Sequence, residues 1–198
     1  MTVQTEARPT ETRPVPAIDP LAEAIADVEG LPEAARSGAT RTKALVIVNW
    51  SGEFDRVLPM LILSSTAAAS GVQCKVFVTF WGLLPFVRDG VRITGENWMQ
   101  KMLAAMQRPG IDHVKLSKMN FLGMGPWMIR RLSRQYHVAS ARELLEAAQA
   151  LGVEFVPCQM TMDLLGIRRD QLIDGMGEPA GAATAIEIMT EADASLFI

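Results

Sequence analysis

Cysteine is the residue type in this chain best suited to covalent chemistry, and Cys158 lies at a sharp break in the sequence pattern. The apolar run 153–157 ends at Pro157, and residues 159–165 have the composition of a helix. A short β-branched and aromatic run that stops at a proline is typical of a buried strand. Cys158 is therefore predicted at the first turn of a helix, where unpaired backbone N–H groups favour a thiolate. A free cysteine is also a common core residue, so a reactive thiolate and a small buried hydrophobe are both open interpretations.

The elements that would position Cys158 alternate between strands and helices. Continuous apolar runs are typical of strands buried on both faces; they predict strands over 44–48, 73–80, 153–157 and 195–198, with a short strand near 172–176. Helical patterns predict helices over 56–70, 96–107, 127–136, 140–151 and 180–192, the fourth starting with a capping box of Ser140 and Glu143. This order predicts an α/β fold with three layers, in which a parallel or mostly parallel sheet has helices on both faces.

The predicted strand ends define a candidate site around Cys158. In parallel sheets, ligands and chemistry collect beyond the carboxyl ends of the strands. Three predicted strand ends meet there, and Cys158 follows one of them. We therefore predict Cys158 as the reactive residue of a site lined by Asn49, Trp50, Ser51, Gly52, Thr79, Phe80, Trp81, Gly82 and Pro157, with Met160 and Met162 on the following helix.

The second cysteine, Cys74, is predicted at the opposite, amino end of its strand. About five residues at ~3.3 Å each separate it from the carboxyl edge of the sheet. A disulfide requires Cα atoms within about 7 Å of each other, so no Cys74–Cys158 bridge is expected. Cys74 is predicted to be a core residue.

The chain divides into an arm and a domain. Residues 1–42 hold five prolines and few large apolar side chains, which predicts a flexible Pro-rich arm. Residues 43–198 are long enough for one α/β domain with a substantial core, and 88–138 form a helical insertion without strand character.

The composition excludes several classes of function. The net charge of −3 gives no sign of nucleic-acid binding, and two cysteines do not make a disulfide framework. The first residues lack the features of a secretory signal, so a reducing cytoplasm is expected. The stretch 57–87 carries Lys75 as its one charge, although serines dilute it. A helix buried against a sheet explains this stretch more simply than the ~20 apolar residues of a spanning helix, and peripheral membrane association also stays open.

Several segments resemble a known family. They are Lys43–Val48, Pro59–Leu63, Val76–Leu83, Gly123–Met128, Cys158–Asp163 and Ala194–Ile198. These motifs resemble the DsrE/DsrF-like sulfur-transfer proteins, in the larger DsrE subtype with a Met/Gly-rich insertion. The resemblance covers most of residues 43–198.

The resemblance implies that Cys158 accepts sulfane sulfur as a persulfide and passes it to a partner thiol. The partners it implies are a TusA-like sulfur carrier, a rhodanese or another persulfide donor or acceptor. It implies no resident metal or cofactor, and a cytoplasmic or membrane-associated location. It leaves open whether the protein turns over as a sulfurtransferase or only carries sulfur.

The sequence also leaves three alternative functions to consider: a copper site, a nucleotide or flavin site, and a non-catalytic interaction protein. Cys158, Met160 and Met162 offer thiolate and thioether ligands that suit Cu(I), although Met usually fills gaps in cores. A nucleotide or flavin site lacks support because no glycine-rich phosphate-binding motif follows the first strand. The Met-rich insertion favours an apolar contact surface, in a homo-oligomer or as a membrane-proximal lid, so a non-catalytic oligomeric interaction protein is a further alternative. That surface would use Met99, Met102, Met106, Met119, Met124 and Met128.

Overall fold

The computed structural model describes residues 42–91, 93, 95, 97–106, 109–118 and 124–198. The predicted arm lies outside the described residues except for Thr42, and so does the part of the Met/Gly-rich loop at 119–123. The remaining predicted elements can be compared directly with the structure.

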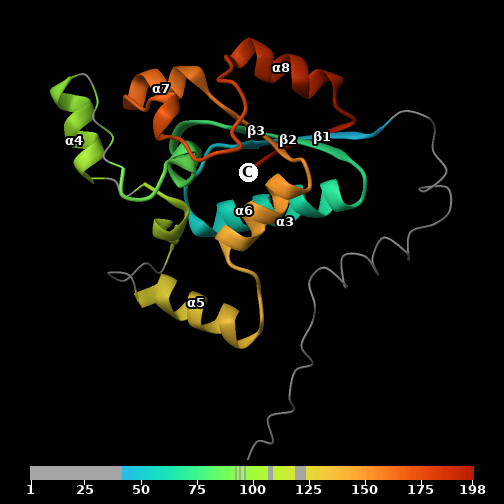
Figure 1. Cartoon of the computed structure of the whole chain (residues 1–198), viewed down its shortest axis with the longest axis horizontal. Coiled ribbons are helices and arrows are strands. Elements are labelled where there is room, and N and C mark those ends of the chain that lie inside the picture. Colours follow the sequence, from blue (N-terminus) through green and yellow to red (C-terminus); the bar gives the residue numbers. More distant parts are fainter. Residues whose placement is uncertain (1–41, 92, 94, 96, 107–108, 119–123) are drawn as a thin grey trace, which may run out of the picture.

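A four-stranded parallel sheet forms the centre of the domain (Figure 1). Its strands are β1 (Ala44–Asn49), β2 (Gln73–Val78), β3 (Glu154–Pro157) and β4 (Ala194–Phe197), in the order β3-β2-β1-β4. Asn49 pairs with Val78, and Val78 pairs with Pro157. The last residues of three strands therefore lie in one row, as expected for a shared carboxyl edge.

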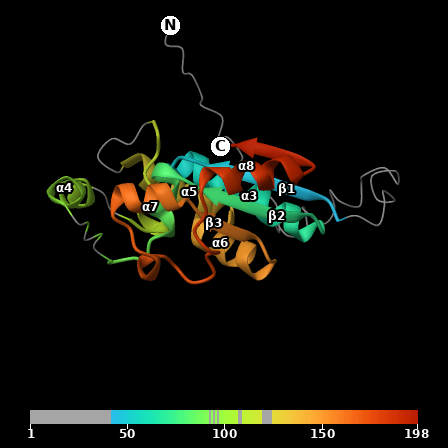
Figure 2. The same cartoon turned by 90° about the horizontal axis from the view of Figure 1, so that it is seen from above.

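Helices cover both faces of the sheet, which confirms the predicted three-layer α/β class. Helices α3 (Phe54–Ala69) and α6 (Ala141–Ala150) pack on one face, and α8 (Ala182–Glu191) lies on the other (Figures 1 and 2). The larger core cluster, which includes Ile47, Val76 and Phe155, lies on the α3 and α6 side. A smaller cluster lies beneath α8.

The start of α6 shows how closely local sequence determines an element here. The Ser140 hydroxyl accepts the Glu143 N–H at 3.2 Å, and the Glu143 carboxylate accepts the Ser140 N–H at 2.7 Å. Both donors would otherwise lack intrahelical partners. The predicted capping box is therefore confirmed.

Two further helices lie in the insertion between β2 and α6. These are α4 (Trp98–Met106) and α5 (Met124–Gln135), and Figure 1 shows both standing away from the sheet. They correspond to the helices predicted over 96–107 and 127–136. Short 3-10 helices, η1 (Phe80–Phe86) and η2 (Ile111–His113), connect this region to the strand ends.

The short strand predicted over 172–176 is wrong. Leu172 makes an isolated antiparallel bridge with Val87, and Met176 makes an isolated parallel bridge with Phe155. Between them Gly175 has a φ of 79°, a left-handed conformation that turns the chain and prevents a continuous ladder.

The apolar stretch 57–87 is divided between α3, β2 and η1. Across the described residues, no helix combines the length and apolar character needed to cross a bilayer.

Candidate functional site

Cys158 lies at the junction between β3 and α7 (Gln159–Leu165), where it is the N-cap residue of the helix. Its N–H donates to the Val78 carbonyl at 2.9 Å, and its carbonyl accepts the Met162 N–H at 3.0 Å. The backbone is thus fixed by the sheet on one side and by the helix on the other. The thiol stands at the carboxyl edge of the sheet, where the sequence places it.

The surroundings of Cys158 favour its thiolate. Burial raises the pKa of this thiol, but hydrogen-bond donation from the Thr161 and Thr79 hydroxyls and from the Thr161 and Met160 N–H groups lowers it by more. The net effect is a pKa below the ordinary value of 9.0. All four groups present N–H or O–H dipoles to the sulfur, which stabilise its charged form.

Two threonine hydroxyls and a backbone amide form a small network beside Cys158. Thr79 Oγ1 and Thr161 Oγ1 are 3.1 Å apart, and the Phe80 N–H donates to Thr161 Oγ1 at 2.9 Å. Because Thr161 Oγ1 accepts from Phe80, its proton can be directed to the sulfur. Phe80 has a φ of 50°, which is rare for a bulky residue and is found where neighbouring structure enforces it.

Thr161 is the functional residue that sequence reasoning missed. It is buried, and it stands three residues after the N-cap cysteine in the first turn of α7. That spacing is the same as in a capping box, in which the N3 side chain reaches back to the N-cap residue. A threonine three residues after the predicted N-cap cysteine was therefore the signal in the sequence that could have placed the Thr161 hydroxyl near the sulfur.

The Cys158 side chain is also buried beneath neighbouring residues. Its exposed fraction is 3%, and it packs with Val48, Phe77, Val156 and Ala185 of α8. Ala180 forms a parallel bridge with Cys158, and its carbonyl accepts the Gln159 N–H at 3.0 Å. The segment from Ala180 into α8 is therefore part of the cover over Cys158.

The other predicted site residues are divided between two places. Thr79, Phe80 and Pro157 lie on the strand ends next to Cys158. Met160 is 68% exposed on the surface of α7, whereas Met162 lies in the larger core cluster.

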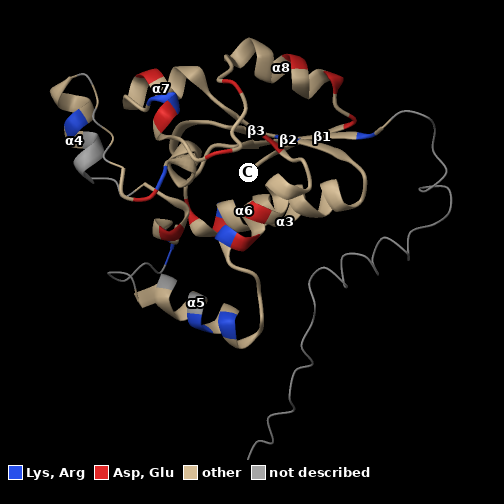
Figure 3. Ribbon diagram, viewed as in Figure 1, with Lys and Arg blue, Asp and Glu red and all other residues tan. Residues whose placement is uncertain are grey.

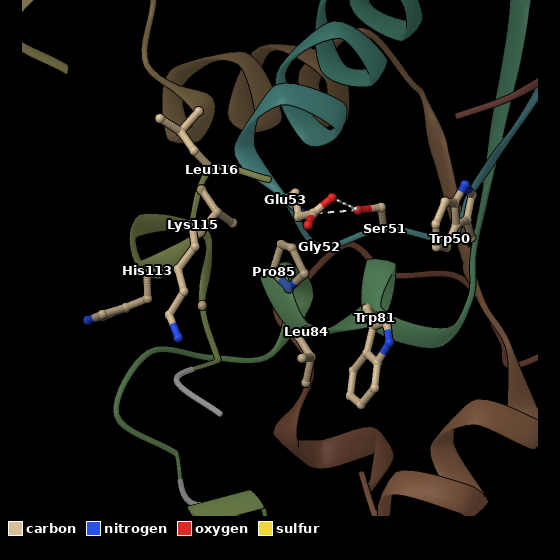
Figure 4. A pocket seen from close by; sticks show the side chains of 12 residues that line it. Trp50, Ser51, Gly52, Glu53, Trp81, Leu84, Pro85, His113, Lys115 and Leu116 are labelled. Carbon is tan, nitrogen blue, oxygen red and sulfur yellow. Dashed lines mark hydrogen bonds between the residues drawn. The ribbon is translucent and has the colours of Figure 1, made fainter. Parts of the chain in front are cut away.

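Four of the remaining predicted residues line a different space. A cavity is lined by Trp50, Ser51, Gly52 and Trp81 but not by Cys158 (Figure 4). The sequence predicted one site from all of these residues. In the structure, some of them lie beside Cys158 and others line this cavity.

Two of the predicted residues, Gly52 and Gly82, have packing contacts that explain their types. A Cβ atom on Gly52 would lie 2.5 Å from the Trp81 carbonyl oxygen, and one on Gly82 would lie 2.4 Å from the Asn49 carbonyl oxygen. Both glycines thus allow the β1–α3 turn and η1 to approach closely. Asn49 is fully buried, and neither Oδ1 nor Nδ2 of its side chain has a hydrogen-bond partner.

The geometry gives little support to a copper site. Cys158 and Met162 belong to different core clusters, and Met160 points to the surface. Three sulfur ligands on a Cu(I) ion must converge on one point, and these side chains diverge. Among the described residues, no group of three or more His, Cys, Asp or Glu side chains could hold a metal ion.

Comparison with known proteins gives related sequences over the whole domain. Residues 41–197 match the model of the DsrE/DsrF/DrsH-like family. The uncharacterized protein YrkE of Bacillus subtilis (strain 168) is 37% identical over 158 residues, which cover 80% of this chain and 98% of that protein. The sulfur carrier protein DsrE2 of Allochromatium vinosum is 35% identical over 159 residues, which cover 79% of this chain and 98% of that protein. The crystal structure of the ychN protein from E. coli aligns with a TM-score of 0.46 at 16% identity, covering 80% of this chain and 100% of that one.

Proposed function

The chain belongs to the DsrE/DsrF/DrsH-like family, and we propose that it carries sulfane sulfur as a persulfide on Cys158. The observation that carries this proposal is the placement of Cys158 as the N-cap residue of α7, with the Thr79 and Thr161 hydroxyls as donors that lower the pKa of its thiol. A buried cysteine with no role is expected to have the opposite shift. The relative named as a sulfur carrier protein supports a sulfur-related role for this chain.

The transfer proceeds by two thiol exchanges that need no oxidant. The Cys158 thiolate attacks the terminal sulfur of a donor persulfide, R–S–SH; the new bond is Cys158 S–S, and the electron pair of the broken S–S bond leaves on R–S⁻. The product is Cys158–S–SH. An acceptor thiolate, R′–S⁻, then attacks the terminal sulfur in the same way, giving R′–S–SH and the Cys158 thiolate.

The donors around Cys158 serve both halves of this exchange. Thr161, Thr79 and the first-turn amides favour the thiolate that attacks. The same groups favour the thiolate that departs when the acceptor takes the sulfur, and a leaving thiol of lower pKa leaves faster. We propose protein thiols as the exchange partners, a TusA-like sulfur carrier or a rhodanese among them.

The experiment that tests the proposal is intact-mass analysis of the reduced protein after treatment with inorganic polysulfide. Wild type and Cys74→Ser gain about 32 Da, the mass of one sulfur atom on one reactive thiolate, and Cys158→Ser gains none. Incubation of the loaded protein with a reduced TusA-like protein then moves the added mass to the acceptor. Equal loading of the Cys158→Ser variant would falsify the proposal.

A second proposal concerns the insertion. Seven Lys and Arg residues against one Asp lie between Asn97 and His137, in a chain whose net charge is −3. The two helices also expose large apolar side chains, and Figure 3 shows Lys and Arg but no acidic residue on them. The exposed apolar set is Trp98, Met99, Met102, Trp127, Met128, Ile129 and Leu132.

We propose that this insertion surface makes the contacts of a homo-oligomer in the cytoplasm. An anionic membrane surface is the second candidate, because helices that combine exposed apolar side chains with Lys and Arg suit a lipid interface. Sedimentation velocity of the full chain, alone and with anionic vesicles, separates the two. A monomer that sediments with the vesicles supports the membrane candidate. An oligomer that does not bind the vesicles supports the homo-oligomer.

A further inference from the structure

The cavity beside the β1–α3 turn has no part in the persulfide chemistry. Its volume is about 360 Å³, and it lies between that turn, η1 and the segment 110–116 (Figure 4). Trp81 and Leu84 of its wall pack against the core cluster on the α3 and α6 side, whereas Cys158 belongs to the cluster under α8. The size is within the range of small-molecule sites.

The cavity is preformed, since backbone hydrogen bonds fix its walls. The Phe54 N–H donates to the Lys115 carbonyl at 2.8 Å, which holds the outer segment against the start of α3. The Gly110 N–H donates to the Leu84 carbonyl at 3.0 Å, which joins the same segment to η1. Binding in this space would therefore cost little ordering of the chain.

A carboxylate stands in the cavity in a fixed position. Glu53 Oε2 accepts a hydrogen bond from the Ser51 hydroxyl at 3.1 Å, and the Glu53 N–H donates to Ser51 Oγ at 3.3 Å. Ser51 itself is buried, with an exposed fraction of 3%. Among the residues that the structure describes, no cation forms an ion pair with Glu53. The carboxylate is thus oriented but not neutralised.

A cation and an apolar wall complete the lining. His113 is engaged with Asp89 at 3.4 Å, whereas Lys115 has no ion pair within the described part of the chain. Figure 4 shows the Lys115 side chain extending along the wall opposite Trp50 and Trp81. The cavity therefore offers one negative group, one positive group and two indole rings.

We propose that this cavity binds a small zwitterion of the α-amino acid type. Its ammonium group would bind the Glu53 carboxylate, and its carboxylate would bind Lys115. An apolar or thioether side chain would lie against Trp50 and Trp81, because indole rings favour polarisable groups. The site is independent of Cys158 and of the persulfide proposal.

The test is isothermal titration of the full chain with three probes that cannot exchange sulfur. S-methyl-L-cysteine carries both charges, 2-(methylthio)ethylamine lacks the carboxylate, and 3-(methylthio)propionate lacks the ammonium group. The zwitterion binds best, and loss of either charge weakens binding by about tenfold, the scale of one charge-assisted hydrogen bond. Equal affinity for the three probes, or binding of none of them, overturns the proposal.

Matched variants assign each end of the ligand. Glu53→Gln reduces affinity for S-methyl-L-cysteine by about tenfold, and Lys115→Gln by about threefold because that side chain is more exposed to solvent. Glu146→Gln and Lys43→Gln, which change the same charges away from the cavity, leave the affinity unchanged. Cys158→Ser also leaves it unchanged, so the cavity and the persulfide carrier can fail separately. If Glu53→Gln binds the zwitterion as wild type does, the assignment is wrong.

Discussion

Cys74 and Cys158 are both free and both buried, yet the same sheet gives their thiols opposite properties. Burial raises the pKa of Cys74 to about 11. Burial acts on Cys158 in the same direction, but the donors from Thr161, Thr79 and the first turn of α7 reverse the shift. Cys74 lies within a strand, where the backbone amides are occupied by the ladder, whereas Cys158 lies where a helix begins. The position at the end of the strand, rather than exposure to solvent, is what separates the pKa of Cys158 from that of Cys74.

The largest expected effect is on alkylation at neutral pH. The reactive species is the thiolate, and a pKa of about 11 in place of 9.0 reduces the thiolate fraction of Cys74 at pH 7 by ~100-fold. We therefore expect iodoacetamide to modify Cys158 at least ~100 times faster than Cys74, measured by peptide mass spectrometry.

Two controls sharpen this first comparison. In denaturant the two cysteines should react at equal rates, because the surroundings that separate them are gone. In the folded protein, the rate for Cys158 should rise with pH and reach half of its plateau value below pH 9, since its pKa is lowered from 9.0. Comparable rates for the two folded thiols would remove the basis of the comparison.

A tenfold effect is expected from Thr161→Val, which removes the hydroxyl while keeping the shape of the side chain. Loss of this donor raises the pKa of Cys158, and one unit corresponds to about tenfold less thiolate and slower persulfide loading at pH 7. It also leaves the partly buried Phe80 N–H without its acceptor, which costs roughly 1 kcal/mol of stability.

Thr161→Ser is the matched control, because serine keeps the hydroxyl. It should restore the pKa of Cys158 and most of the alkylation rate even if stability is not fully recovered. Thr79→Val should show a smaller shift in the same direction, since its hydrogen bond contributes less than that of Thr161. If Thr161→Val and Thr79→Val both alkylate at the wild-type rate, the threonines do not polarise the thiol.

A smaller effect on the alkylation rate of Cys158 is expected when α8, the helix that covers it, is destabilised. Glu187 is exposed near the middle of α8, and glycine there destabilises the helix by about 1 kcal/mol relative to alanine. If access requires α8 to open, Glu187→Gly should increase the alkylation rate of Cys158 about fivefold over Glu187→Ala. Both variants remove the same charge, so the difference reports opening alone. Equal rates would mean that reagents reach the sulfur by another route.

The sequence predicted the fold better than it predicted the site. Apolar runs and the Ser140 capping box are local signals, and each determined its element. The convergence of Asn49, Thr79 and Pro157 at one sheet edge followed from parallel topology alone. The contacts between distant segments were not available from such patterns. Thr161 reaches Phe80 across more than eighty positions of sequence, and the face on which each strand-end residue lies depends on the backbone of η1.

The smallest effect on the two thiols is expected from Ser140→Ala, which acts on the Cys74 side of the sheet only. Loss of the cap removes the acceptor for the Glu143 N–H and destabilises the protein by about 1 kcal/mol. Because α6 packs on the cluster that contains Cys74, the slow alkylation of Cys74 through local opening on the α6 side should increase about twofold to threefold, since only part of the lost stability acts on that opening. Cys158, under α8 on the opposite face, should react at the wild-type rate. A matching increase at Cys158 would show that both thiols open through one global event, and the difference between the two ends of the sheet would then be one of pKa and not of access.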